Sequence, residues 1–241
     1  MTQTSEPYDP DNLLDRLSSD VALDHHYRLL ERREQAIIRR RLPLTGGRVL
    51  SVGAGWHPGR HLFPAPAFEI VAVDSDPAKI AGLAANGRAD EVLHGSAGEL
   101  ALPDASFDIV LYRLVLHHVA FQGPLAPVFA EAARLLAPGG ALVAIEPGLW
   151  HPVGAGLALA NRAGLGELTH GTPDDIPLSP RRLCEESRAA GLVPELHSVT
   201  YTWRRLPVAL QRAIGTADEF GSRPRAAALG HTLMLIARRP S

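Results

Sequence analysis

The chain has 241 residues, of which 46% are hydrophobic and 21% are charged, and its formal net charge is −2 with histidine neutral. This length and apolar content fit one large globular domain and exclude a disordered, collagen-like or coiled-coil protein. Proteins that wrap phosphate backbones usually carry a basic surplus. The near balance of 24 basic and 26 acidic residues therefore argues against a nucleic-acid partner.

The cysteine content and the N-terminus indicate a cytoplasmic protein. Cys184 is the single cysteine, so the sequence has neither a disulfide framework nor a thiolate metal site. The N-terminus is polar and acidic, unlike the basic start and apolar run of a signal peptide. No apolar stretch approaches the roughly 18 residues that a membrane-spanning helix needs. We therefore expect no membrane partner.

Residues 1–241 are expected to form a single domain that begins with a helical cap. Residues 1–42 predict this cap, in two helical pieces. The second piece, LLERREQAIIRRRL over residues 29–42, is amphipathic with a basic polar face. We interpret that face as a solvated helix surface.

Residues 46–146 alternate short apolar runs with helical segments, the pattern of a parallel sheet with right-handed crossovers. The runs are continuously apolar, as in strands buried on both faces. Asp76 is suited to cap a helix that has Pro77 in its first turn. A further helix is expected to stop at Pro138. The predicted strands cover residues 48–52, 69–74, 91–95, 107–112 and 141–147.

The remaining residues depart from this alternation. Residues 179–192 predict a helix, and residues 193–203 and 229–238 predict two late strands. Two mostly apolar segments, 147–178 and 204–228, lie between these elements. We interpret both as inserts on the substrate side of the domain.

A glycine-rich turn follows the first predicted strand. Gly53 and Gly55 can bring the backbone close to a ligand because no Cβ is in the way. Asp74 closes the second strand, where a carboxylate can accept hydrogen bonds from ribose hydroxyls. This pattern serves dinucleotides and other adenosine cofactors alike. A dinucleotide site needs a third glycine where this sequence has Pro58, which disfavours a nicotinamide-dependent reductase.

Several ordered motifs resemble the class I S-adenosylmethionine-dependent methyltransferases, in the broad branch that acts on small molecules. The segments are VLSVGAGWHPGRHL, VAVDSDP, GSAGELALPDASFDIVLYRLVLHHV and RLLAPGGALVAIEP, and they lie within residues 49–147. The resemblance implies an α/β, Rossmann-like, doubly wound sheet of seven strands with helices on both faces. That sheet is mainly parallel and ends in an antiparallel hairpin, which fits the two late strands.

The resemblance also implies a reaction and a cofactor site. A methyl group would pass from S-adenosylmethionine to an O, N or C nucleophile, leaving S-adenosylhomocysteine. A specialised biosynthetic pathway is one process that uses such a reaction. The glycine turn would contact the methionine part, Asp74 the ribose, Ser96 the adenine edge, and Arg113 the methionine end. The implied cofactor-binding set is Gly53, Ala54, Gly55, Asp74, Ser75, Ser96, Ala97 and Arg113.

Three features depart from the family's pattern. Ser51 stands where the family usually has an acid, Ser96 stands where it often has an aspartate, and the glycine turn is two residues longer. These departures leave a second interpretation open. In it, the chain is a methyltransferase-like domain that transfers no methyl group and instead binds the cofactor structurally or acts as a partner subunit.

His118 and His151 are the predicted catalytic residues. His118 follows the fourth predicted strand and His151 the fifth, where either could take a proton from an acceptor that arrives as a hydroxyl or an ammonium. Glu146 and His151 offer only two ligands, so we expect no metal. The apolar inserts favour a partly apolar small-molecule acceptor. The oligomeric state stays open, with a homodimer as one option.

Overall fold

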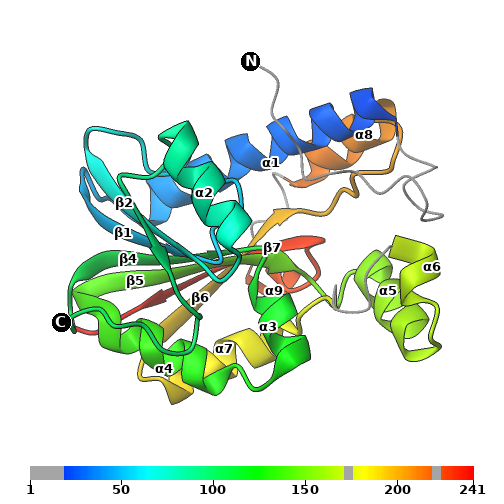
Figure 1. The fold of residues 1–241 in the computed structure, drawn as a ribbon. Coiled ribbons are helices and arrows are strands. Elements are labelled where there is room, and N and C mark those ends of the chain that lie inside the picture. The colour runs from blue at the N-terminus through cyan, green and yellow to red at the C-terminus, as the bar shows by residue number, and fades with distance from the viewer. Residues whose placement is uncertain (1–18, 171–175, 219–223) are drawn as a thin grey trace.

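The computed structural model describes residues 19–170, 176–218 and 224–241, in which seven strands form one sheet in the order β3-β2-β1-β4-β5-β7-β6 (Figure 1). The strands are β1 (Gly47–Val52), β2 (Phe68–Asp74), β3 (Glu91–His94), β4 (Phe107–Arg113), β5 (Leu136–Pro147), β6 (Val193–Thr200) and β7 (Thr232–Arg238). Strands β1 to β5 pair in parallel, and β7 runs antiparallel to β5 and β6. The predicted seven-stranded, mainly parallel sheet with an antiparallel end is confirmed.

Helices cover both faces of this sheet, as predicted (Figure 1). One face carries α1 (Asp20–Arg41), α2 (Pro77–Asn86) and α8 (Val208–Asp218), and the other carries α3 (Leu116–Gln122), α4 (Ala126–Leu135) and α7 (Pro180–Ala189). Beyond the sheet lie α5 (Pro152–Arg162) and α6 (Gly166–His170), and the short helix α9 (Pro224–Ala227) precedes β7.

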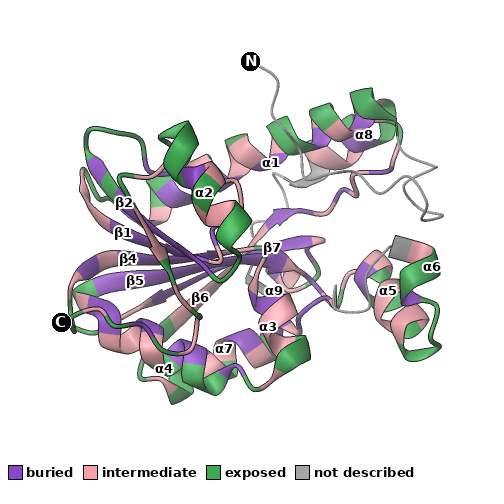
Figure 2. Cartoon of the chain, in the orientation of Figure 1, coloured by how far each residue is buried: buried purple, intermediate pink, exposed green. Residues whose placement is uncertain are grey.

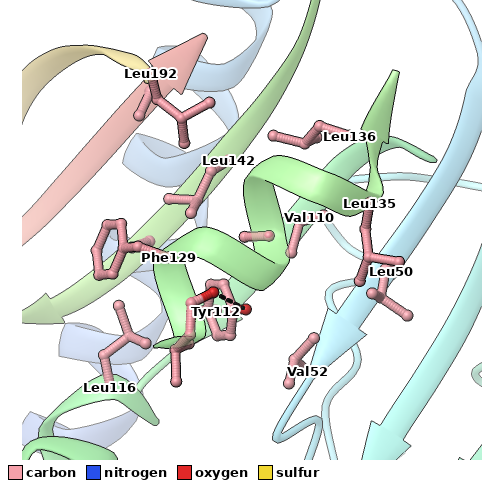
Figure 3. Packing of buried hydrophobic residues seen from close by; sticks show 14 of the residues in the cluster. Leu50, Val52, Val110, Tyr112, Leu116, Phe129, Leu135, Leu136, Leu142 and Leu192 are labelled. Atoms are coloured by element: carbon pink, nitrogen blue, oxygen red, sulfur yellow. Dashed lines mark hydrogen bonds between the residues drawn. The ribbon is translucent and has the colours of Figure 1, made fainter. Parts of the chain in front are cut away.

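The five inner strands, β2, β1, β4, β5 and β7, are largely buried on both faces, which explains their continuous apolar sequence (Figure 2). In β4, Val110 and Tyr112 pack with Phe129 of α4 (Figure 3). The intervening Leu111 points to the opposite face and joins the cluster that contains Leu30 of α1. Two apolar layers therefore hold the strand ends in fixed positions.

The N-terminal cap contains one long helix within the described residues. Ser19 caps α1, because its hydroxyl oxygen accepts the Ala22 N–H at 3.2 Å. One stripe of the helix is buried, made of Ala22, His26, Leu30, Glu34 and Ile38. The first predicted helical piece falls mostly in residues 1–18, which lie outside the described residues.

Some boundaries differ from the predicted ones. Helix α4 ends at Leu135, because Leu136 already pairs with Phe107 of β4, and Pro138 therefore lies inside β5. Residues 53–67, after β1, form turns and no helix. Among the described helices, none combines the length and the apolar content that crossing a membrane requires.

Candidate active site

The candidate active site lies at the carboxyl ends of the parallel strands. β1 and β4 are neighbours, and the chain continues from them toward opposite edges of the sheet. The position beyond their ends is the topological switch point, where open α/β sheets bind their ligands. The turn after β1, the ends of β2 to β5 and helix α1 contribute the residues described below.

Gly53 and Gly55 give the turn after β1 its left-handed backbone, with φ of 62° and 52°. A Cβ on Gly53 would collide with the side chain of Val115, so this glycine lets the turn pack against the start of α3. A Cβ on Gly55 would meet nothing within 4 Å. Ala54 between them is buried and donates its N–H to the Val73 carbonyl at 3.1 Å. The turn thus presents bare backbone at the switch point.

Asp74 ends β2 beside this turn and is bonded to it. Its Oδ2 accepts the Gly55 N–H at 2.9 Å, and its Oδ1 accepts the Asp76 N–H at 3.0 Å. Only 6% of the residue is exposed. An ionised carboxylate can accept about four hydrogen bonds. The two backbone bonds therefore orient the group and leave it able to accept hydroxyl donors.

Ser75, Ser96 and Ala97 lie on the turns that follow β2 and β3. The two strands are in register at Asp74 and His94, so these turns are adjacent at the same edge. His94 Nε2 donates to the Ser75 carbonyl at 3.2 Å, which ties one turn to the other. The structure therefore brings the predicted adenine-side residues next to Asp74.

Arg113 ends β4 and pairs with Glu34 of α1. Two guanidinium nitrogens lie 3.3 Å from the two carboxylate oxygens, and His61 Nε2 lies 2.9 Å from Glu34 Oε2. Burial alone would raise the pKa of the Glu34 carboxyl, but Arg113 and His61 hold it below its ordinary value. Sequence analysis missed Glu34, since no local pattern links a helix acid to a distant strand end.

A second buried pair joins β5 to α3. His117 Nδ1 lies 2.6 Å from Glu146 Oε2, and Glu146 Oε1 accepts the backbone N–H groups of Val115 at 3.0 Å and Leu116 at 2.8 Å. Both side chains are buried. Sequence analysis weighed Glu146 only as a metal ligand beside His151. The signal that could have identified the pair is an acid at the end of an otherwise apolar strand.

The two predicted catalytic histidines differ in their surroundings. The ring of His118 lies 4.1 Å from that of His117, centroid to centroid, and the residue is half-buried. His151 caps α5: its Nδ1 accepts the Val153 N–H at 3.2 Å, and its Nε2 donates to the Tyr201 carbonyl at 3.1 Å. Burial lowers the pKa of His151. This histidine would have to release one bond before taking a proton from an acceptor.

His151 also belongs to a group of three histidines from three elements. His231, directly before β7, lies 5.1 Å from His151 and 6.2 Å from His26 of α1, both edge to face. Burial, with Arg204 nearby, lowers the pKa of His26 to about 4 and that of His231 well below its ordinary value. Within the described ranges, no three His, Cys, Asp or Glu side chains are arranged to hold a metal ion.

Comparison with known proteins finds one matching family and several similar sequences. Residues 50–144 match the methyltransferase-domain family. A Mycolicibacterium smegmatis protein named "Probable S-adenosylmethionine-dependent methyltransferase" is 31% identical over 148 residues, covering 58% of this chain and 55% of that protein. A similarly named Mycobacterium tuberculosis protein is 34% identical over 117 residues, covering 48% and 42%. The chain spans about half the length of the curated relatives it matches.

Solved structures share the fold at low sequence identity. A SAM-dependent methyltransferase from Archaeoglobus fulgidus has a TM-score of 0.58 at 17% identity, covering 87% of this chain and 94% of that chain. The [4+2]-cyclase SpnF has a TM-score of 0.55 at 21% identity, covering 87% and 80%. The sheet order, the domain match and the sequence relatives agree with one another. Residues 50–144 therefore carry a methyltransferase domain, and the chain has the fold of S-adenosylmethionine-dependent methyltransferases.

Proposed function

We propose that this chain transfers a methyl group from S-adenosylmethionine to an O, N or C nucleophile of a small molecule. The contact between Asp74 and the glycine turn is the main support for the proposal, because a carboxylate oxygen of Asp74 accepts the Gly55 N–H at 2.9 Å. That bond fixes an oriented anion beside bare backbone at the switch point. A carboxylate beside exposed backbone suits a ligand that has ribose hydroxyls and a polar amino-acid end.

The residues at this edge fit the adenosine part of the cofactor. Asp74 would accept hydrogen bonds from both ribose hydroxyls, and Ser75 would lie beside the adenine. Ser96 would accept a bond from the adenine amino group, more weakly than a carboxylate would. Ala97 would pack against the ring edge. When bound, S-adenosylmethionine supplies a methyl group activated by its sulfonium sulfur.

Arg113 and Glu34 would receive the amino-acid end of the cofactor. Together they present one positive and one negative group, and the cofactor's amino-acid end carries an α-carboxylate and an α-ammonium. Their 3.3 Å contacts are longer than the about 2.7–2.9 Å of a tight charge-assisted hydrogen bond. The pair is therefore suited to exchange partners with a zwitterion. Because Glu34 belongs to α1, binding there would hold this helix over the site.

His117, oriented by Glu146, would take the proton of the acceptor when the acceptor carries one. If Glu146 accepts the Nδ1–H, Nε2 is the basic nitrogen of a neutral ring. A base is needed only when the acceptor arrives as a hydroxyl or an ammonium. Otherwise, holding the reacting atoms in line supplies most of the rate enhancement, worth about 7–11 kcal/mol at best. His118 and His151 stay predictions for the same role.

The acceptor would bind between the inserts over residues 147–178 and 204–228. The first insert forms α5 and α6, which project beyond the carboxyl ends of the strands (Figure 1). Leu159 on α5, Leu165 between the two helices and Leu168 on α6 are 68%, 47% and 62% exposed. Exposed leucines beside a candidate site favour a partly apolar acceptor.

Parallel calorimetric titrations with S-adenosylmethionine, S-adenosylhomocysteine and NADH test this proposal. We expect micromolar binding of the first two and none of NADH. Formation of S-adenosylhomocysteine with a mixture of small-molecule acceptors, followed by mass spectrometry, then tests turnover. Binding of NADH alone would overturn the proposal. Tight cofactor binding without turnover on any acceptor would favour the non-methylating interpretation instead.

A further inference from the structure

A hollow of ligand size lies between α1 and α8. Its volume is about 550 Å³, and its polar lining consists of Asp24, His25, Arg28 and Arg32 of α1 together with Arg212 of α8. Sites that enclose small ligands measure about 300–1,000 Å³. The buried stripe of α1 faces the sheet, and none of its members lines the hollow. The hollow thus shares no residue with the candidate active site.

The lining is basic in a chain whose formal net charge is −2. It holds three guanidinium groups and one carboxylate, and Asp24 pairs with Arg28 at 3.0 Å. Among the described residues, neither Arg32 nor Arg212 has an acceptor. Arg33, by contrast, donates to the Gly215 carbonyl at 2.6 Å on the same pair of helices. Two guanidinium groups are therefore available to a ligand.

The spacing of the arginines differs from that on a solvated helix of the same chain. On α7, Arg181 and Arg182 each have a glutamate four residues later, at 2.7 Å and 3.7 Å. On α1, Arg28 and Arg32 are themselves four residues apart, so like charges share one face and repel. A bound anion would remove that repulsion.

We propose that this hollow binds a small molecule through a phosphate or carboxylate group, at a site separate from the methyl-transfer site. Guanidinium groups suit this chemistry, because their planar fork matches two oxygens of either anion. Arg32 and Arg212 approach from different helices, so one anion can bridge α1 and α8. Phosphate esters and carboxylates are two sources of this chemistry, and the experiment distinguishes them.

Calorimetric titration of the full chain with inorganic phosphate, and separately with citrate, at constant ionic strength tests the proposal. We expect one saturable site, and the tighter of the two anions identifies the source. Arg32→Gln and Arg212→Gln should each weaken that affinity about tenfold, the effect of losing one charged hydrogen-bond partner. Arg181→Gln, which removes an exposed arginine from α7, is the matched control and should leave the affinity unchanged.

The outcomes separate this site from the cofactor site. S-adenosylmethionine affinity, measured in the same variants, should not change. If Arg32→Gln and Arg212→Gln also weaken the binding of S-adenosylmethionine, the hollow is part of the cofactor site and the proposal is wrong. Absence of saturable binding for both anions, or affinity that survives both substitutions, equally overturns it. Equal urea midpoints for all the variants would verify that each one folds.

Discussion

Glu146 binds His117 through one carboxylate oxygen, at 2.6 Å from Nδ1, and accepts the Val115 and Leu116 N–H groups through the other. A single side chain at the end of β5 therefore fixes both the imidazole ring and the helix that carries it. A buried carboxylate that is fully bonded in this way orients its partners strongly, and its loss leaves buried donors without an acceptor.

Glu146→Gln is expected to lower the free energy of unfolding by about 1–3 kcal/mol, because the amide cannot satisfy all three donors. Urea denaturation at pH 7 measures this difference. Glu69→Gln is the matched control: Glu69 pairs with Arg48 on the surface, where loss of an ion pair costs about 0–1 kcal/mol. Equal destabilisation by the two substitutions would mean that Glu146 does not hold the start of α3.

Asp74→Ala is expected to weaken S-adenosylmethionine binding by about 1.5–3 kcal/mol, since it removes a charged acceptor for the ribose hydroxyls. Calorimetric titration measures the change in affinity. Asp76→Ala is the neighbouring control, because Asp76 caps α2 by accepting the Ala78 N–H at 2.8 Å. It should cost about 1 kcal/mol of stability and leave the cofactor affinity unchanged. Unchanged affinity in Asp74→Ala would mean that the ribose lies elsewhere.

The sheet could be predicted from the sequence because its signals are local. Continuous apolar runs specify buried strands, and the glycine turn and Asp74 are recognised by their order along the chain. Partners that come from distant segments could not be predicted. Glu34 meets Arg113 only because α1 folds onto the sheet, and His26 meets His231 for the same reason. Such contacts follow from tertiary packing, which no pattern within a single element encodes.

The positions at which helices and strands end are also not fully predictable from local sequence patterns. Proline and glycine at residues 138–140 predict the end of a helix, yet pairing of Leu136 with Phe107 ends α4 at Leu135. Competition between the helix and the neighbouring strand decides the outcome there.

Glu34→Gln is expected to destabilise the fold by roughly 2–4 kcal/mol, because it leaves the Arg113 guanidinium largely buried without its carboxylate. Arg113→Met should cost a similar amount by leaving the buried Glu34 without its guanidinium partner. The double variant should be more stable than the sum of the two losses predicts, and urea denaturation of all four proteins measures this coupling. Additive losses would show that the 3.3 Å pair contributes nothing to holding α1.

The stability of the fold is expected to fall as the pH drops from about 6.5 to 4, and His26 is one cause. Burial, with the charge of Arg204 and the neighbouring His25, lowers the pKa of His26 to about 4. An unfolded histidine titrates near about 6.5, so between these values only the unfolded chain binds the proton. The contribution of His26 to stability is therefore complete above about pH 6.5 and is lost toward about pH 4. For a pKa shift of this size, the loss is roughly 3 kcal/mol. The buried His231 also has a lowered pKa and adds to the loss in the same direction.

Urea midpoints measured at several pH values between 7 and 4 test this expectation. His26→Leu places an apolar side chain on the buried stripe of α1 and removes the titrating group, so the stability of this variant should depend less on pH over this window. His94→Gln is the control, because His94 is exposed at the end of β3 and its loss should leave the pH dependence unchanged. Carboxylates whose pKa is lowered, such as that of Glu34, begin to lose their contribution only below about pH 4.5, so they overlap the window of His26 at its acid end alone. If His26→Leu retained the full pH dependence of the unsubstituted chain, the packing of α1 against His231 would not be what acid weakens.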